Sequence, residues 1–259
     1  MTGTTELLVA RDGPVTILTL NRPNAANSLT PGLIAELGRA LADCRDDDDV
    51  RVVVLTGSGD RAFCAGTDLR GAPDTSALED QFGVTPLHLS RGMQMWKPVI
   101  AAVNGYAVGG GFELALACDL RFASTTATFS LPEARIGSMP GAGGTQRLIR
   151  QAPYALAMEL LLSGNRWDAH KAERVGLVNE VCEPGELLVR TLAMAQRIAE
   201  NAPLSLKAIK QAVARGQGVE LSAGLAVERT LFNLLRDTDD RKEGRAAFAE
   251  KRKPRFTGR

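Results

Sequence analysis

Short apolar runs rich in β-branched residues alternate with helical patterns along most of this chain. The clearest runs cover residues 15–20, 52–56 and 98–103. Strands that read as continuous apolar runs are typical of parallel sheets buried on both faces. Their alternation with helices is typical of a layered α/β core. The sequence therefore predicts an α/β fold that contains parallel strands.

Two parts of the chain differ in their predicted secondary structure. In the first part strands and helices alternate, and a helix over residues 111–118 directly follows the strand at 98–103. The strand pattern is then lost, and three amphipathic helical patterns follow at residues 203–215, 221–235 and 241–251. We therefore expect an α/β core over residues 1–194 and a helical region over residues 195–259.

Length, charge and cysteine content restrict the class of protein. The chain has 259 residues, of which 44% are hydrophobic and 24% charged, as in an ordinary globular protein. A net charge of +1 gives no overall attraction to nucleic acid or to an acidic membrane. The four cysteines are scattered, so neither a disulfide framework nor a metal site is predicted. Without a signal segment or a membrane span, a cytoplasmic protein is expected.

Two glutamates accompany the glycine-rich segments of the chain. Glu113 follows the glycine triplet 109–111, which lies between a predicted strand and a predicted helix. The N–H groups at such a helix start attract negative charge, including the oxygen of a polarised carbonyl. Glu133 precedes the second glycine-rich segment, residues 139–146. Paired carboxylates beside exposed N–H groups predict proton transfer next to a stabilised oxyanion.

Other interpretations of these segments have less support. Residues 141–144 resemble a phosphate loop but lack the lysine of a Walker A motif. Cys64 is a conceivable nucleophile, but a partner histidine would have to be His88 or His170, and both lie in unremarkable surroundings. We expect a polar surface loop at residues 71–83.

The C-terminal segment is basic. From Arg241 onward it carries eight Lys and Arg against two Glu, a local charge of +6. Such a segment suits RNA, a phosphorylated small molecule or a partner subunit. A non-enzymatic RNA-binding protein is therefore an alternative from another class, although the nearly neutral whole chain argues against it.

Five segments in this order resemble those of the enoyl-CoA hydratase/isomerase (crotonase) superfamily, and specifically its hydratase branch. The resemblance covers nearly the whole chain. It rests on residues 22–27 (RPNAAN), 63–69 (FCAGTDL), 104–113 (NGYAVGGGFE), 131–135 (LPEAR) with 140–146 (PGAGGTQ), and 248–254 (FAEKRKP).

The resemblance implies a fold and an assembly. The fold would be a crotonase-like spiral of ββα units, followed by a C-terminal helical region that mediates trimer formation. The protein would then be a homotrimer, or a homohexamer made of two trimers. Neither nucleic acid nor a membrane would be a partner.

The resemblance also implies a reaction, the reversible addition of water to a trans-2-enoyl-CoA. The backbone N–H groups of Thr67 and Gly110 would bind the thioester oxygen and stabilise the developing enolate. Glu113 and Glu133 would hold one water between them. Glu113 would activate it for attack at C3, and Glu133 would deliver the proton to C2. An enoyl-CoA isomerase or a specialised acyl-CoA dehydratase of the same fold is the alternative.

Coenzyme A would enter as part of the substrate, and no further cofactor or metal would be required. The residues expected to contact it, by the same resemblance, are Arg22, Asn24, Ala26, Ala65, Asp68, Leu69 and Lys251. Lys251 would reach the CoA phosphates, from a neighbouring subunit in the assembly. Asn24 occupies a position that is often basic in relatives, so one charge contact of the family is missing here.

Overall fold

The computed structural model describes residues 5–68, 89 and 92–259. The strands are β1 (Leu7–Asp12), β2 (Val15–Leu20), β3 (Val52–Gly57), β4 (Ala62–Cys64), β5 (Val99–Val103), β6 (Tyr106–Val108), β7 (Leu120–Ser124), β8 (Thr128–Ser130), β9 (Trp167–Asp168) and β10 (Glu180–Cys182). The helices are η1 (Pro23–Ala25), α1 (Pro31–Asp46), α3 (Gly110–Ala117), η2 (Glu133–Ile136), α4 (Gly144–Gln151), α5 (Tyr154–Ser163), α6 (Ala169–Arg174), α7 (Leu187–Ala199), α8 (Pro203–Gly216), α9 (Leu221–Leu235) and α10 (Asp239–Ala249).

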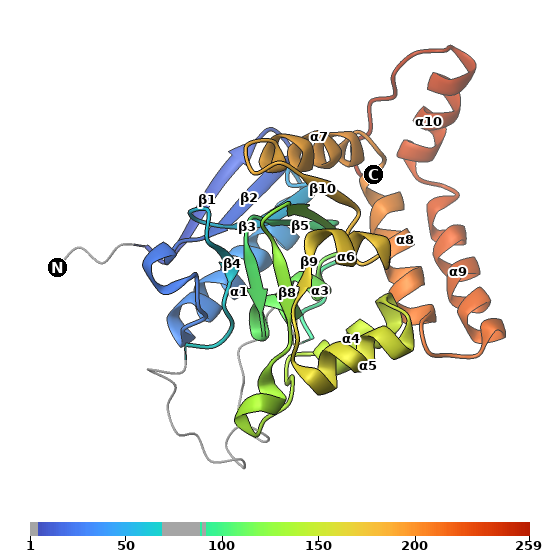
Figure 1. The fold of residues 1–259 in the computed structure, drawn as a ribbon. Helices are drawn as coiled ribbons and strands as arrows, with labels where there is room; N and C mark the ends of the chain where they lie inside the picture. Colours follow the sequence, from blue (N-terminus) through green and yellow to red (C-terminus); the bar gives the residue numbers. More distant parts are fainter. Residues whose placement is uncertain (1–4, 69–88, 90–91) are drawn as a thin grey trace.

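Consecutive strands divide between two sheets (Figure 1). The larger sheet has the order β1-β2-β3-β5-β7-β10, and the smaller has the order β4-β6-β8-β9. The pairs β3/β4, β5/β6 and β7/β8 thus each give one strand to each sheet, and the chain winds as a spiral. Pairing is antiparallel between β1 and β2 and between β8 and β9, and parallel between the other neighbours. The predicted α/β spiral is confirmed.

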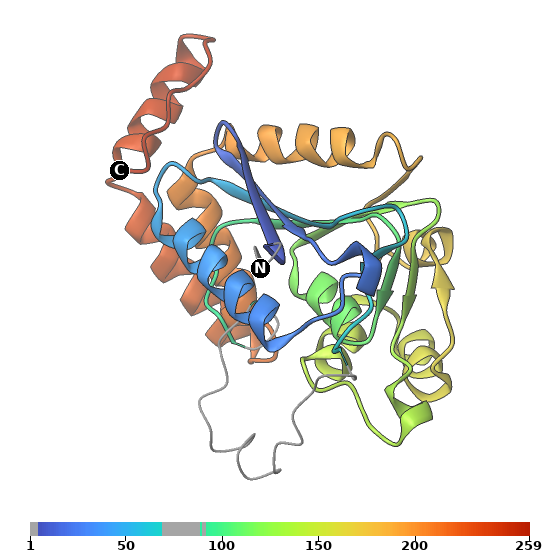
Figure 2. The ribbon, with the colours of Figure 1, turned by 90° about the vertical axis from the view of Figure 1, so that its left-hand side faces the viewer.

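Strands β3 and β5, at the centre of the large sheet, are buried on both faces, which explains their continuous apolar sequences, whereas the edge strand β1 is mostly exposed. Because side chains alternate along a strand, Val52 and Val54 of β3 face α7, whereas Val53 and Leu55 belong to the main core on the other face. Figure 2 shows α7 along one face of this sheet and α1 along the opposite face. The main core also holds α3 and the small sheet, and it positions the functional site.

Local sequence signals explain where several elements begin. The side chain of Thr30 accepts a hydrogen bond of 3.0 Å from the N–H of Leu33, and Pro31 is the first residue of α1. The predicted strands at 15–20, 52–56 and 98–103 are β2, β3 and β5. Strand β10 begins only at Glu180, because the N–H groups of Leu177 and Val178 donate back to Ala172 of α6.

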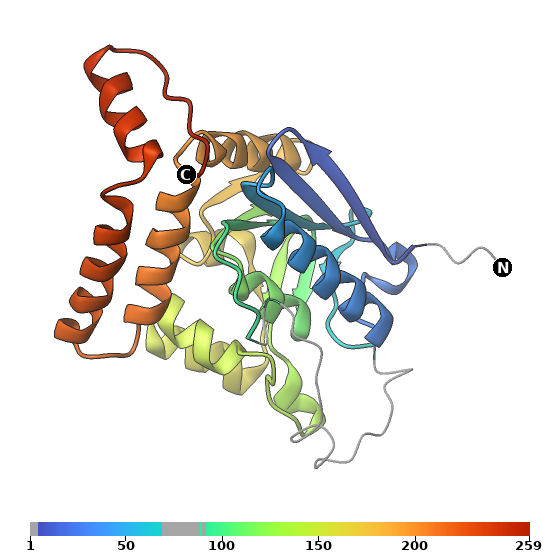
Figure 3. The same ribbon diagram turned by 180° about the vertical axis from the view of Figure 1, so that it is seen from behind.

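The C-terminal helices lie at the side of the spiral. Figures 1 and 3 show α8 and α9 side by side, with α10 extending beyond the rest of the molecule. Neither α8 nor α9 contains a buried residue. The α7 helix crosses the boundary expected near residue 195 and packs on the large sheet. Over the described parts of the chain, we find no helix with the length and apolar character needed to cross a membrane.

Candidate active site

Two backbone segments meet where α3 begins. Gly109 has φ of 54° and donates its N–H to the Ser130 carbonyl at 2.9 Å, and α3 starts at the next residue. Gly66, with φ of 86°, packs against this start: a Cβ on Gly66 would lie 2.8 Å from the Val108 oxygen and 3.1 Å from the Gly110 nitrogen. The conformation and the close approach both require glycine at position 66.

The N–H groups of Thr67 and Gly110 come together at this contact. The nitrogen of Thr67 lies 3.8 Å from the position that a Cβ on Gly110 would take. Neither N–H donates a hydrogen bond to another residue within the described ranges. The pair therefore forms a donor site at a helix N-terminus, where a developing negative charge is favoured.

Glu113 lies in the first turn of α3 and is only 3% exposed. One oxygen, Oε1, accepts hydrogen bonds from the N–H of Ala142 at 2.7 Å and of Gly144 at 2.8 Å. A Cβ on Gly144 would lie 3.0 Å from this oxygen, so glycine there leaves room for the carboxylate. The glycine-rich segment before α4 therefore binds a carboxylate of the chain itself, Glu113.

Glu133 begins η2 and lies over the same helix start. Its Oε1 is 3.0 Å from the position that a Cβ on Gly109 would take. Its Oε2 is buried and has no hydrogen-bond partner among the described residues. Burial raises the pKa of this carboxyl above its ordinary value of 4.5, and the nearby charge of Glu113 raises it further, while a backbone hydrogen bond at Glu133 itself opposes both effects. The two carboxylates are thus electrostatically coupled.

Arg147 of α4 completes the surroundings of Glu113. Its Nη1 donates to the Ala142 carbonyl at 2.9 Å, so it binds the residue whose own N–H donates to Glu113. Burial lowers the pKa of the guanidinium, and the charge of Glu113 opposes that shift. Ala142, Gly144 and Arg147 were not expected from the sequence as supports of the site. The glycine-rich composition of 141–144 was the available signal, since closely packed N–H groups also bind a side-chain carboxylate.

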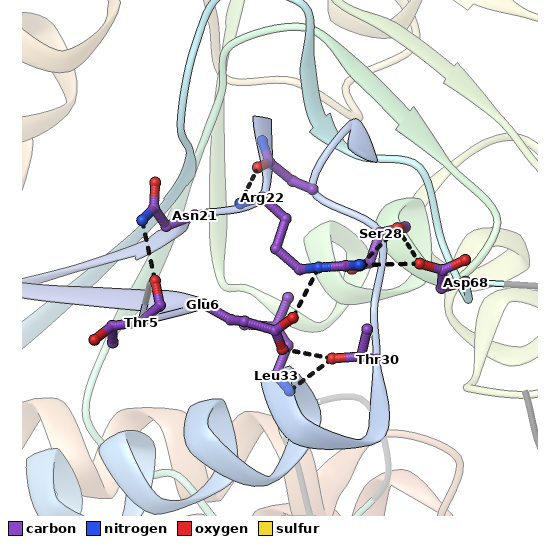
Figure 4. A network of polar contacts seen from close by, with 9 residues as sticks. Thr5, Glu6, Asn21, Arg22, Ser28, Thr30, Leu33 and Asp68 are labelled. Carbon is purple, nitrogen blue, oxygen red and sulfur yellow. Dashed lines mark hydrogen bonds and ion pairs between the residues drawn. The ribbon is translucent and has the colours of Figure 1, made fainter. Parts of the chain in front are cut away.

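The expected CoA turn folds next to the donor site. The Ala26 carbonyl accepts from the N–H of Ala65 at 3.0 Å, so residues 22–26 and Ala65 are adjacent. Asn24 is exposed on η1. The guanidinium of Arg22 points inward to Glu6, Ser28 and Asp68 (Figure 4).

The remaining residues expected to bind CoA are Leu69 and Lys251. Leu69 falls outside the described residues, as do His88 and the loop expected at 71–83. Lys251 is exposed after the end of α10, the helix that extends away from the spiral (Figure 3).

The residues considered for other chemistry show no catalytic arrangement. Cys64 is buried, and desolvation raises the pKa of its thiol to about 12, so it carries no thiolate at neutral pH. His170 is exposed on α6, 3.8 Å from Glu173. Arg135, two residues after Glu133, donates to the Ser163 carbonyl and to Asn165. Within the described part of the chain, no group of three or more His, Cys, Asp and Glu is arranged to hold a metal.

Two coupled carboxylates next to paired backbone donors, on a spiral of two sheets, define an acid–base enzyme that acts on a polarised carbonyl compound. The sequence profile of the enoyl-CoA hydratase/isomerase family matches residues 11–259. The chain belongs to this family.

Curated relatives and solved structures match over almost the entire chain. The (E)-benzylidenesuccinyl-CoA hydratase of Thauera aromatica is 48% identical over 250 residues, covering 94% of this chain and 96% of that protein. The 2,3-dehydroadipyl-CoA hydratase of Escherichia coli is 45% identical, covering 98% and 99%. The structure of an enoyl-CoA hydratase from Bacillus anthracis is 38% identical with a TM-score of 0.93, covering 98% and 100%.

Proposed function

We propose that the protein is an enoyl-CoA hydratase that reversibly adds water to a trans-2-enoyl-CoA and yields the 3-hydroxyacyl-CoA. The observation that carries this proposal is the unequal pair of carboxylates. Glu113 is held by two N–H donors, whereas Glu133 presents a buried oxygen without a partner among the described residues. A hydratase needs both a base for the water and an acid for the carbon, and the pair provides two carboxyl groups in different environments.

The raised pKa of Glu133 supports the division of labour. A carboxyl that retains its proton more readily is the better donor, so Glu133 is assigned proton delivery to C2 and Glu113 activation of the water. The water oxygen forms a bond to C3, and the electron pair of the double bond moves toward the thioester. Glu113 takes a proton from the water, and the carbon at C2 receives one from Glu133.

The N–H groups of Thr67 and Gly110 are proposed to bind the thioester oxygen during this step. They converge at the start of α3, where the helix dipole adds to their effect. Because these donors belong to the main chain, a threonine side chain at position 67 is compatible with the role. The loss of one such donor typically raises the barrier by about 3 kcal/mol.

Coenzyme A is proposed to lie along the turn formed by residues 22–26 and Ala65. Asn24, Ala26 and Ala65 face it directly, while Arg22 and Asp68 bind each other and shape the turn. Leu69 is included on the basis of the family resemblance. We further propose a cytoplasmic homotrimer or homohexamer, in which Lys251 reaches the CoA phosphates of a neighbouring subunit. All four cysteines are unpaired, as a reducing compartment requires.

The preferred acyl group of the substrate can be tested directly. The two relatives described above are named for benzylidenesuccinyl-CoA and dehydroadipyl-CoA, acyl groups derived from dicarboxylic acids. We therefore propose that acyl groups with a terminal carboxylate be compared with simple short and medium chains. The higher kcat/KM identifies the preferred class.

The decisive experiment follows the loss of enoyl absorbance in the wild type and in Glu113→Gln and Glu133→Gln. Each substitution removes the acid–base function of one carboxyl while it keeps the size of the side chain. We expect kcat to fall by a factor of at least about 100 in each variant, with CoA-ester binding retained. Glu159→Gln is the matched control, since Glu159 of α5 is an exposed carboxylate that pairs with Lys171 of α6.

Two results would contradict the proposal. If either Glu113→Gln or Glu133→Gln hydrated the substrate at nearly the wild-type rate, the two-carboxylate mechanism would be wrong. A wild-type protein that leaves crotonyl-CoA unchanged but shifts the double bond of a 3-enoyl-CoA would be an isomerase of the same family.

A further inference from the structure

Arg22 is the centre of a partly buried network that joins three segments of the chain (Figure 4). Its Nε pairs with Glu6, just before β1, at 2.9 Å, and its Nη2 pairs with Asp68 at 3.1 Å. Its Nη1 donates to both the carbonyl and the hydroxyl of Ser28, at 2.7 and 2.9 Å. Each of the three guanidinium nitrogens is therefore engaged within the protein.

The network ends on the residue next to a proposed oxyanion donor. Asp68 directly follows Thr67, and its Oδ2 accepts from Arg22 and from the hydroxyl of Ser28, the latter at 3.2 Å. The backbone around Thr67 is also hydrogen-bonded to Leu29, next to Ser28. The N–H of Leu29 donates to the Gly66 carbonyl at 2.8 Å, and the N–H of Asp68 donates to the Leu29 carbonyl at 3.0 Å. These bonds lie on both sides of the Thr67 N–H.

The arrangement leaves the Thr67 N–H with little freedom to rotate. The carbonyl of Gly66 and the N–H of Asp68 both bind Leu29, which forms a parallel bridge with Thr67. The Asp68 side chain forms an ion pair with Arg22. Both side chains are largely buried, with 14% of Asp68 and 20% of Arg22 exposed. Charged hydrogen bonds of a planar guanidinium fix direction as well as distance.

We propose that Arg22 and Asp68 are positioning residues of the oxyanion hole, which hold the Thr67 N–H in the direction of the thioester oxygen. Glu6 supports them by orienting the guanidinium from the side of β1. The proposal rests on the proposed function, because it assumes that Thr67 supplies one of the two donors. It differs from a CoA contact, which would act on binding of the CoA portion in ground state and transition state alike.

The test compares Arg22→Gln, Arg22→Lys and Asp68→Asn with the wild type. Arg11→Gln is the matched control, because it breaks an exposed ion pair of 3.0 Å between Arg11 of β1 and Asp47. Steady-state hydration of crotonyl-CoA gives kcat and KM separately. The infrared carbonyl stretch of bound butyryl-CoA, labelled with carbon-13 at the thioester, reports the hydrogen bonds made to its oxygen. Thermal unfolding shows that each variant is folded.

We expect kcat to fall about tenfold to a hundredfold in Arg22→Gln and Asp68→Asn, while KM changes by less than about threefold. The carbonyl stretch should move toward its frequency in water in the same two variants. Arg22→Lys should recover part of kcat, since it keeps the charge opposite Asp68 but loses the planar fork. Arg11→Gln should match the wild type in all three measurements.

Other outcomes would overturn the inference. A raised KM and weaker binding of free CoA with unchanged kcat would make Arg22 a CoA contact. A lower kcat with an unchanged carbonyl frequency in folded variants would mean that Thr67 keeps its position without Arg22. If the wild type hydrated no enoyl-CoA, the proposed function would fail, and the butyryl-CoA spectrum would still test the positioning. If Arg22→Gln were unfolded, Asp68→Asn and Arg22→Lys would decide.

Discussion

Glu113 and Glu133 show how the same side chain acquires different properties within one site. Glu113 is buried deeply and is compensated by two N–H donors. Glu133 is half-buried, and its Oε2 has no partner within the described residues. An uncompensated carboxylate is costly to the folded state, and the raised pKa of Glu133 expresses that cost. The side chain proposed to donate the proton is therefore also a source of instability.

Glu133→Gln should stabilise the protein at neutral pH by about 1 kcal/mol, at the lower end of the cost of an unsatisfied buried group. The folded-state pKa of Glu133 lies above its ordinary value of 4.5. In the pH window between the unfolded-state pKa and the folded-state pKa of this carboxyl, the folded protein therefore binds more protons than the unfolded chain. The free energy of unfolding of the wild type thus falls as pH rises through this window. The gain of the variant should be larger at pH 7 than at pH 4, as measured by denaturant unfolding.

The same comparison contains its own control. Glu159→Gln removes an exposed carboxylate that forms a surface ion pair with Lys171, and it should change stability little at either pH. An equal gain for Glu133→Gln at pH 4 and at pH 7 would contradict the assignment of a raised pKa to this residue.

At the scale of elements, two glycine turns decide the geometry of the donor site. The turn at Gly66 and the start of α3 touch through their backbones, and a side chain at Gly66 would separate them. A positive φ alone is a weaker requirement, because several surface glycines share it. What distinguishes Gly66 is the combination of a positive φ with a close backbone neighbour.

Gly66→Ala should lower kcat at least about tenfold, because its Cβ would lie 2.8 Å from the Val108 oxygen and displace the Thr67 N–H from Gly110. Gly176→Ala is a matched control: Gly176 has φ of 78°, compared with 86° for Gly66, but no atom lies within 4 Å of its added Cβ. Both variants should lose roughly 1 kcal/mol of stability through backbone strain. Equal hydratase activity in the two variants would show that the Gly66 contact does not position the donor.

At the scale of the whole molecule, the C-terminal helices expose large apolar side chains. Leu221, Leu225 and Phe232 lie at helical spacing on α9 and are 75%, 51% and 53% exposed. Phe248 of α10 is 87% exposed. Apolar surface of this extent is typical of a subunit interface, which supports the proposed trimer.

Leu221→Glu combined with Leu225→Glu should therefore convert the proposed trimer to smaller species and lower its melting temperature by several degrees, because charges would be buried at an interface. Light scattering coupled to gel filtration measures the change. Val189→Glu on α7 is the control, since it places the same charge on another exposed apolar position, 68% exposed. A monomeric wild type, or an unchanged mass in the double variant, would contradict this interface.

Local signals in the sequence were sufficient for the α/β class, the strands β2, β3 and β5, the cap of α1 and the helices α8 and α9. These features depend on the periodicity of apolar residues and on residues adjacent in the chain, so they can be read without the fold. Strands β4 and β6 were not predicted, because three-residue strands carry too little pattern. The glutamate pair was recognised from its glycine-rich setting and the family resemblance.

Tertiary structure alone decided what each functional residue contacts. Glu113 binds N–H groups about 30 residues away, at Ala142 and Gly144, and Arg22 binds Asp68 across 46 positions. No local pattern encodes these pairs, since the winding of two sheets brings them together. The pKa of Glu133 likewise depends on burial and on the charge of Glu113, both of which arise only on folding. The sequence by itself determined the chemical groups and their local conformation, and the fold determined their distances and charges.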